Sequence, residues 1–181
     1  MKNKETKKIS GEKIDLREVI SADVTLEYCA WLNDQEVGKY METRFTKHTI
    51  ETTKDYVEKA NLDPNTVFFA IVRKDINKFI GTIKLGDIYW DHGFGSVAIM
   101  IGDKDSWGKG FAAEAIRLFS DYALVNLKMH KLLAGTYEDN LGSIKAFKKA
   151  GFYEEFRQKR QYLSGGKYVD RIVLVKFNEG S

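Results

Sequence analysis

Apolar and polar residues follow one another along the chain in segments of two kinds. Period-2 alternation and short apolar runs bounded by turn residues predict strands at 12–19, 66–74, 78–90, 95–102, 131–138, 152–163 and 167–177. Apolar residues at helical spacing predict helices at 21–34, 49–62, 111–128 and 140–151. We expect Ser21 or Asp23 to cap the first helix, Thr49 to cap the second, and Gly151 to end the fourth.

The order of these elements predicts the fold class. The strands at 66–74 and 78–90 are separated by a short polar turn, which favours a hairpin. From residue 95 onward, strands and helices alternate, and a last hairpin turns at 164–166. We therefore expect an α/β or α+β fold with a mixed, mostly antiparallel sheet and helices on both faces.

Composition limits the number of domains and the kind of partner. A chain of 181 residues, 43% of them hydrophobic, is long enough for one buried core and short for two. We expect a flexible basic tail at residues 1–11 and a single domain at 12–181. The formal charge of +3 is mild, which argues against a nucleic-acid partner, and no apolar run approaches the ~20 residues of a membrane span.

Cysteine and histidine usage points to an intracellular protein without a metal. Cys29 is the single cysteine, so no internal disulfide can form, and the three histidines lack metal-ligand spacing. We expect a cytoplasmic, metal-free protein, and a homodimer is an alternative that the sequence leaves open.

The segment Ser106–Ala115, SWGKGFAAEA, places two glycines directly before strong helix formers. A glycine turn that leads into a helix N-terminus presents free N–H groups and a partial positive charge to an anion, so a phosphate-bearing ligand is the first hypothesis. A Walker-type loop is excluded because no hydroxyl residue follows Lys109. A dinucleotide site is disfavoured because the position about 20 residues further on is Lys128 rather than an acid.

A second motif, Asp139–Phe152 (DNLGSIKAFKKAGF), follows the next predicted strand. Asn140 stands at a helix start, with Ser143 about one turn on and Phe147 one turn further. The two motifs together resemble those of the GNAT superfamily of N-acetyltransferases. Their residues are similar to those of its ribosomal-protein N-acetyltransferase-like branch. The resemblance covers roughly residues 14–177.

The resemblance implies a fold in which two neighbouring strands splay apart to hold acetyl-CoA. It implies that backbone N–H groups between Trp107 and Ala112 meet the pyrophosphate and that the strand before the loop lines the pantetheine wedge. The implied cofactor-binding residues are Ile99, Met100, Ile101, Trp107, Gly108, Lys109, Gly110, Phe111, Ala112, Asn140, Phe147 and Lys148.

Two residues are candidates for catalysis. Many members of the superfamily place a tyrosine acid where this chain has Phe147, so Ser143 becomes the candidate that hydrogen-bonds the leaving sulfur. A primary amine is almost wholly protonated near pH 7 and must lose a proton before it attacks. Glu138, at the end of its predicted strand, is the candidate base, and a strand N–H near Met100 or Ile101 is the candidate to stabilise developing negative charge.

The acceptor is a small primary amine in our interpretation. Tyr40, Glu42 and Arg44 lie between the first two predicted helices and suit a ligand with a ring, an amine and a negative group, such as a nucleotide-linked amino sugar. A protein N-terminus is the alternative acceptor. Two further hypotheses from other classes are a non-catalytic acyl-CoA sensor and a nucleotide-binding module.

Overall fold

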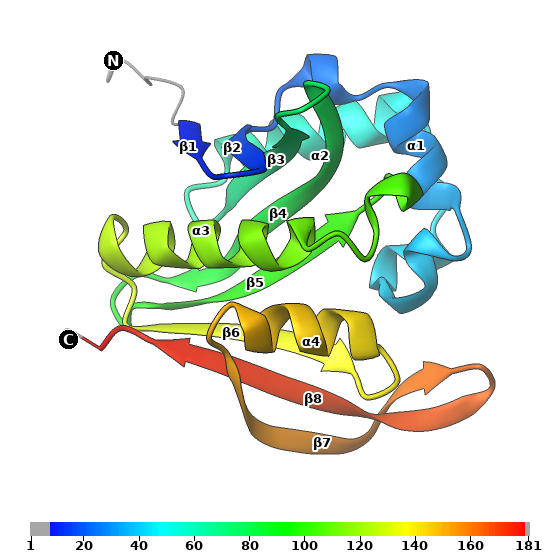
Figure 1. Ribbon diagram of the computed structural model, residues 1–181. Coiled ribbons are helices and arrows are strands. Elements are labelled where there is room, and N and C mark those ends of the chain that lie inside the picture. Colours follow the sequence, from blue (N-terminus) through cyan, green and yellow to red (C-terminus); the bar gives the residue numbers. More distant parts are fainter. Residues whose placement is uncertain (1–7, 180–181) are drawn as a thin grey trace.

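The computed structural model describes residues 8–179, and its sheet carries helices on both faces (Figure 1). The strands are β1 (Lys8–Ser10), β2 (Ile14–Glu18), β3 (Val67–Arg73), β4 (Lys78–Tyr89), β5 (Phe94–Ile101), β6 (Lys131–Tyr137), β7 (Tyr153–Ser164) and β8 (Lys167–Phe177). The α-helices are α1 (Leu26–Asn33), α2 (Ile50–Leu62), α3 (Phe111–Val125) and α4 (Leu141–Lys149). The short 3-10 turns are η1 (Ser21–Asp23), η2 (Val37–Tyr40), η3 (Glu42–Phe45) and η4 (Lys104–Ser106).

The strand order is β1-β2-β3-β4-β5-β6-β8-β7, and neighbouring strands are antiparallel except for the central pair β5 and β6. This parallel pair is joined only from Phe94↔Lys131 to Ser96↔Leu133. Both strands continue beyond that point without pairing to each other, and β5 then keeps only β4 as a partner. The sheet therefore splays between the second halves of β5 and β6, as the family resemblance implied.

The helices form two layers, and each layer buries its own core. Helices α3 and α4 lie on the face turned to the viewer in Figure 1, and α1 and α2 lie behind the sheet. Ile116 and Phe119 of α3 are fully buried in a cluster with residues of β2 to β6 and β8. Tyr28 and Trp31 of α1 pack in a second cluster, where both rings contact Phe79 of β4. The predicted fold class is confirmed.

Two predicted boundaries at the start of the chain were wrong. Helix α1 is capped by the hydroxyl of Thr25, which accepts the Tyr28 N–H at 3.2 Å, rather than by Ser21 or Asp23. Asp23 instead forms a bidentate ion pair with Arg17 of β2, with N–O distances of 2.7 and 2.6 Å. Lys8–Ser10, placed in the predicted tail, pair with β2 as a strand, and residues 1–7 lie outside the described residues.

Strands β7 and β8 form a long hairpin whose tip reaches the side of the molecule where α1 and the η2–η3 segment lie (Figure 1). The pairing is irregular between Gln158 and Tyr162, and Arg160 has a positive φ of 50° in this stretch. An irregular ladder bends and twists a strand. The hairpin thus comes within reach of η3, a contact described with the site below.

Candidate active site

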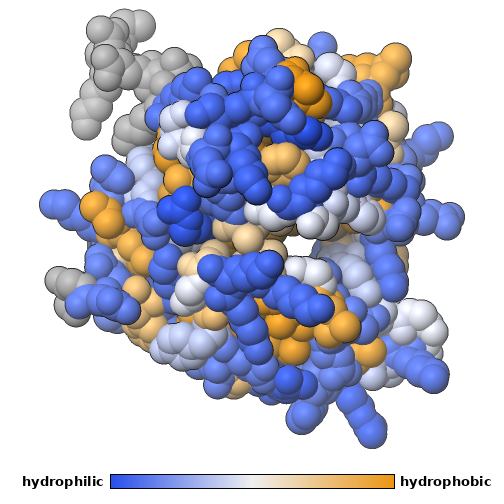
Figure 2. All heavy atoms as spheres, viewed as in Figure 1, coloured by the Kyte–Doolittle hydropathy of each residue, from blue (hydrophilic) through white to orange (hydrophobic). Residues whose placement is uncertain are grey.

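A cavity of about 640 Å³ opens beside the splayed end of β5. Figure 2 shows a hollow near the centre of this face, between the upper part of the molecule and the lower part that carries α4, β7 and β8. Its walls come from η2, the end of β5, the glycine loop, the first turn of α3 and one face of α4. Among the residues singled out in the sequence, those that line it are Tyr40, Ile99, Met100, Ile101, Trp107, Gly108, Gly110, Phe111, Ala112, Asn140 and Ser143.

The glycine loop leaves space in front of the start of α3. Gly108 and Gly110 have φ angles of +72° and +87°, which side-chain-bearing residues rarely adopt, and Gly110 is the N-cap of α3. A Cβ placed on either glycine would meet nothing within 4 Å. The first N–H groups of this 15-residue helix therefore face the cavity without a side chain in front of them, which is the geometry of an anion cradle.

The end of β5 presents a polar strand edge to the same cavity. Gly102, just after β5, donates its N–H to the Ile80 carbonyl at 2.9 Å, so that residue faces β4. Successive strand residues direct their N–H and C=O groups to opposite edges, so Ile99 and Ile101 face the splay and Met100 faces β4. The indole of Trp107 confirms this direction, because it donates to the Ile101 carbonyl at 2.8 Å.

The start of α4 positions Ser143. The side-chain oxygen of Asn140 accepts the Ser143 N–H at 3.2 Å and caps the helix, which holds Ser143 in its first turn beside the cavity. Phe147 is only 3% exposed and packs against Phe152 in the core, so it anchors α4 to the core and does not line the cavity. Lys109 and Lys148, also predicted to bind the cofactor, are exposed and do not line the cavity.

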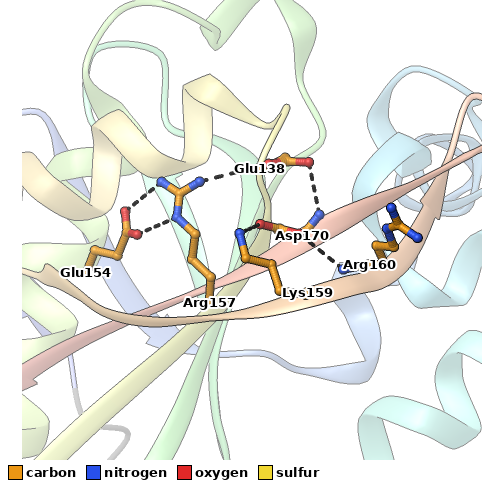
Figure 3. Close-up of polar contacts among 6 residues, drawn as sticks. All are labelled: Glu138, Glu154, Arg157, Lys159, Arg160 and Asp170. Atoms are coloured by element: carbon orange, nitrogen blue, oxygen red, sulfur yellow. Dashed lines mark hydrogen bonds and ion pairs between the residues drawn. The ribbon is translucent and has the colours of Figure 1, made fainter.

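Glu138 points away from the cavity, toward β8 (Figure 3). Its carboxylate accepts the Asp170 N–H at 3.0 Å and lies 3.9 Å from an Arg157 guanidinium nitrogen. Arg157 also pairs with Glu154, and Asp170 pairs with Lys159 at 2.7 Å. The carboxylate proposed as base from its place in the sequence is therefore part of an ion-pair network that braces β6, β7 and β8.

Glu42 and Arg44 meet around a tyrosine that sequence reasoning missed. Tyr137, at the end of β6 and 3% exposed, donates its hydroxyl hydrogen to Glu42 at 2.5 Å and accepts a hydrogen bond from Arg44 at 2.8 Å. Burial, reinforced by the Glu42 carboxylate, raises the pKa of Tyr137, so the phenol stays protonated as a donor. Its ring stacks on Tyr162 at 4.1 Å and contacts Tyr40, which lines the cavity.

Arg44 connects η3 to the tip of the β7–β8 hairpin. Its guanidinium donates to the carbonyls of Met41 at 3.0 Å and Leu163 at 3.1 Å, in addition to Tyr137. A second link is the Ser164 hydroxyl, which donates to Asp139 at 2.8 Å. Most donors of Arg44 are thus used within the protein, which makes it a positioning residue rather than an open site for a ligand anion.

A salt bridge ties the segment before η2 to the segment before the glycine loop. Lys104 of η4 contacts Asp34 at 2.9 Å and Glu36 at 2.8 Å, and the Asp34 carboxylate also accepts the N–H groups of Glu36 and Val37. The hydrogen bond from Lys104, followed by these N–H groups, lowers the pKa of Asp34 to about 2. Glu36 carries the only carboxylate among the described residues that line the cavity.

Residues 8–179 hold no cluster of three or more His, Cys, Asp or Glu side chains that could bind a metal ion. Nor does any helix of this span have the length and apolar character to cross a membrane. Cys29 is buried, and its sulfur lies 3.6 Å from the Thr53 hydroxyl oxygen.

A splayed parallel strand pair beside a glycine-capped helix is the architecture that the sequence resemblance implied. The chain matches the family model described as Acetyltransferase (GNAT) domain over residues 13–153. It is also 30% identical over 165 residues to "Uncharacterized N-acetyltransferase p20" of Bacillus licheniformis, with 88% of this chain and 89% of that protein covered. The chain therefore belongs to the GNAT family of acetyltransferases, and the resemblance stated from its two motifs is confirmed.

Solved structures show the same fold over nearly the whole chain. A spermidine N-acetyltransferase from Vibrio cholerae, solved in complex with CoA and spermine, superposes with a TM-score of 0.81 at 20% identity, covering 93% of this chain and 97% of that one. RimL, a ribosomal L7/L12 alpha-N-protein acetyltransferase in complex with coenzyme A, superposes with a TM-score of 0.85 at 14% identity, covering 97% and 100%. At these identities the likeness is one of fold.

Proposed function

We propose that this chain, an N-acetyltransferase of the GNAT type, transfers acetyl from acetyl-CoA directly to the primary amine of a small molecule. The observation that carries this assignment is the cavity itself. Three features face one space. They are the N-terminus of α3 at Gly110, which has no side chain in front of it, the polar edge of β5 at Ile99 and Ile101, and Ser143 in the first turn of α4. Pyrophosphate, pantetheine amides and a thioester need these three features in one site.

The residues of the cavity have distinct parts in the reaction. The N–H groups at the start of α3 hold the pyrophosphate, because a helix N-terminus favours negative charge. The N–H groups of Ile99 and Ile101 point into the splay, where they orient the acyl donor and stabilise developing negative charge. When bound, acetyl-CoA supplies an activated acyl group. Ser143 donates a hydrogen bond to the departing sulfur, and its backbone N–H is held in the first turn of α4 by the Asn140 cap.

The amine must lose a proton at the acceptor end of the cavity. Glu138 faces β8, and Glu42 is occupied by the Tyr137 hydroxyl. Glu36 is the carboxylate that lines the cavity, and its salt bridge to Lys104 uses Oε2, so that within residues 8–179 no group donates a hydrogen bond to its Oε1. We therefore assign proton acceptance to Glu36, either directly or through a water molecule, in place of Glu138.

A small acceptor is favoured by the contacts that join the segments next to Tyr40. Arg44 and Ser164 join η3, the end of β6 and the tip of the β7–β8 hairpin beside Tyr137, whose ring contacts the cavity-lining Tyr40. A protein N-terminus needs an open groove for the residues that follow the amine, whereas these contacts hold the segments next to Tyr40 together. A peptide acceptor is the second candidate because the fold is shared with a ribosomal-protein acetyltransferase as well as with a spermidine acetyltransferase.

The experiment that tests the acceptor class is an amine panel assayed with the purified protein. Amino sugars, nucleotide-linked amino sugars, polyamines, amino acids and peptides with different N-terminal residues are incubated with acetyl-CoA, and acetylated products are identified by mass spectrometry. We expect the highest kcat/KM with a small amine. Efficient transfer confined to one peptide would overturn the proposal, and saturable acetyl-CoA binding without turnover on any amine would favour an acyl-CoA sensor.

A nucleotide-binding module is separated from this function by ligand stabilisation. A ligand that binds the native state raises the midpoint of thermal unfolding in proportion to its binding free energy. We expect acetyl-CoA to raise the melting temperature and NAD and ATP to leave it nearly unchanged. A larger shift with NAD or ATP would contradict the assignment of the glycine loop to coenzyme A.

A further inference from the structure

The cavity has an excess of positive charge that the reaction does not use. Four charged residues line it, namely Glu36, Lys39, Lys145 and Lys149. Glu36 pairs with Lys104 at 2.8 Å, and Lys104 also pairs with Asp34. No ion pair within residues 8–179 involves Lys145 or Lys149. Two uncompensated ammonium groups at the edge of a ligand cavity attract an anionic group of the ligand.

The two lysines are neighbours on one face of α4. Residues four apart in a helix have Cβ atoms about 5–6 Å from each other, so both ammonium groups of Lys145 and Lys149 can contact one phosphate. Ala146, between them, lines the cavity as well. Lys148 stands on the same helix and is equally exposed, but it does not line the cavity, and its positive charge helps lower the pKa of Glu154. The chain thus contains its own matched control.

The lysine pair and the N-terminus of α3 are two separate groups of donors that can bind negative charge. The helix N-terminus at Gly110 offers N–H groups, which suit the bridged oxygens of a pyrophosphate. Lysine ammonium groups are compact point charges with three rotatable donors, which suit a phosphate monoester that carries nearly two negative charges. Coenzyme A has both kinds of group, a pyrophosphate and a 3′-phosphate on its ribose.

We propose that Lys145 and Lys149 bind the 3′-phosphate of coenzyme A and so select the phosphorylated cofactor over its dephosphorylated form. This inference rests on the function proposed above. It adds a specificity-determining pair to the reaction, since neither lysine is needed for the chemistry at the thioester. It also replaces Lys148, which the sequence suggested, with its two neighbours on the face that the cavity exposes.

The test compares CoA with dephospho-CoA, which lacks only the 3′-phosphate. Dissociation constants are measured by calorimetry for the wild-type protein, for Lys145→Ala/Lys149→Ala and for Lys148→Ala. We expect the wild type to bind CoA at least tenfold more tightly than dephospho-CoA. The double variant should lose at least tenfold in affinity for CoA and less than threefold for dephospho-CoA, whereas Lys148→Ala should keep the wild-type preference.

Three outcomes would count against the inference, and they are distinguishable. Equal affinity of the wild type for CoA and dephospho-CoA overturns it while leaving the proposed function intact. An equal loss of affinity for CoA and dephospho-CoA in the double variant also overturns it, because the lysines would then bind the pyrophosphate. Failure of the wild type to bind either ligand contradicts the proposed function itself. Circular dichroism of each variant verifies that the exposed substitutions leave the fold unchanged.

Discussion

Replacing Gly110 by aspartate places a negative charge where the pyrophosphate is expected. The residue caps α3 with a φ of +87°, and a Cβ there would meet no atom within 4 Å, so the new side chain projects into the cavity without a clash. Two unit charges about 5 Å apart repel by roughly 3 kcal/mol at an effective dielectric constant near 20. Gly110 is exposed and salt screens the pair, so we expect a loss of about 1.4–3 kcal/mol, or ten- to hundredfold in affinity for CoA.

Gly110→Asn is the control that separates charge from backbone strain. Asparagine and aspartate tolerate a positive φ to a similar degree and have nearly the same shape. Both variants should therefore melt within a few degrees of each other, and the difference in their CoA dissociation constants, measured by calorimetry, should shrink at high salt. Equal CoA affinity of Gly110→Asp and Gly110→Asn would refute the position assigned to the pyrophosphate.

Four further results are expected. Ser143→Ala should lower kcat at least tenfold and leave the KM for acetyl-CoA nearly unchanged, since its hydroxyl acts on charge that develops during the reaction. Glu36→Gln should alter the pH profile of kcat/KM more than Glu138→Gln does, and the reverse ranking would restore Glu138 as the base. Arg44→Lys should raise the KM for the amine severalfold while CoA affinity in calorimetry stays constant, because lysine cannot bridge Met41, Tyr137 and Leu163. Asp34 has a folded-state pKa lowered from 3.8 to about 2, so its stabilising contribution is present above pH 3.8 and lost as the pH falls through 2; urea unfolding should accordingly show Asp34→Asn destabilised at pH 7 but not at pH 2.

The parts of the site that rest on local signals could be predicted from the sequence. Gly110 before a run of helix formers and Asn140 three residues before Ser143 are capping patterns, whose partners lie within one turn. The apolar strand ending at Ile101 and the loop after it are continuous in the chain, so their meeting at one cavity follows from their order. The family resemblance supplied the ligand to which these local features belong.

The parts that depend on distant partners could not be predicted. Glu138 was a reasonable base by position, but its partners Arg157 of β7 and Asp170 of β8 come from later strands, and no local pattern reveals that β8 pairs with β6 and β7 with β8. Tyr137 and Arg44 are 93 residues apart. The signal for Tyr137 in the sequence was weak, because the strand predicted at 131–138 places it at the strand end, just before the motif at 139–152. Nothing in the sequence indicated its contact with η3.

The emission of Trp107 gives the most direct test that the cavity holds the acyl donor. This indole lines the cavity and donates to the strand-edge carbonyl of Ile101, whereas Trp31 is buried under the sheet and Trp90 hydrogen-bonds near Pro64. Titration with acetyl-CoA should change the tryptophan fluorescence saturably in the wild type. In Trp107→Phe, acetyl-CoA should still bind in calorimetry without this fluorescence change. Saturable binding to the wild type with unaltered emission, or the same change in Trp107→Phe, would contradict the cavity between β5, α3 and α4 as the acetyl-CoA site.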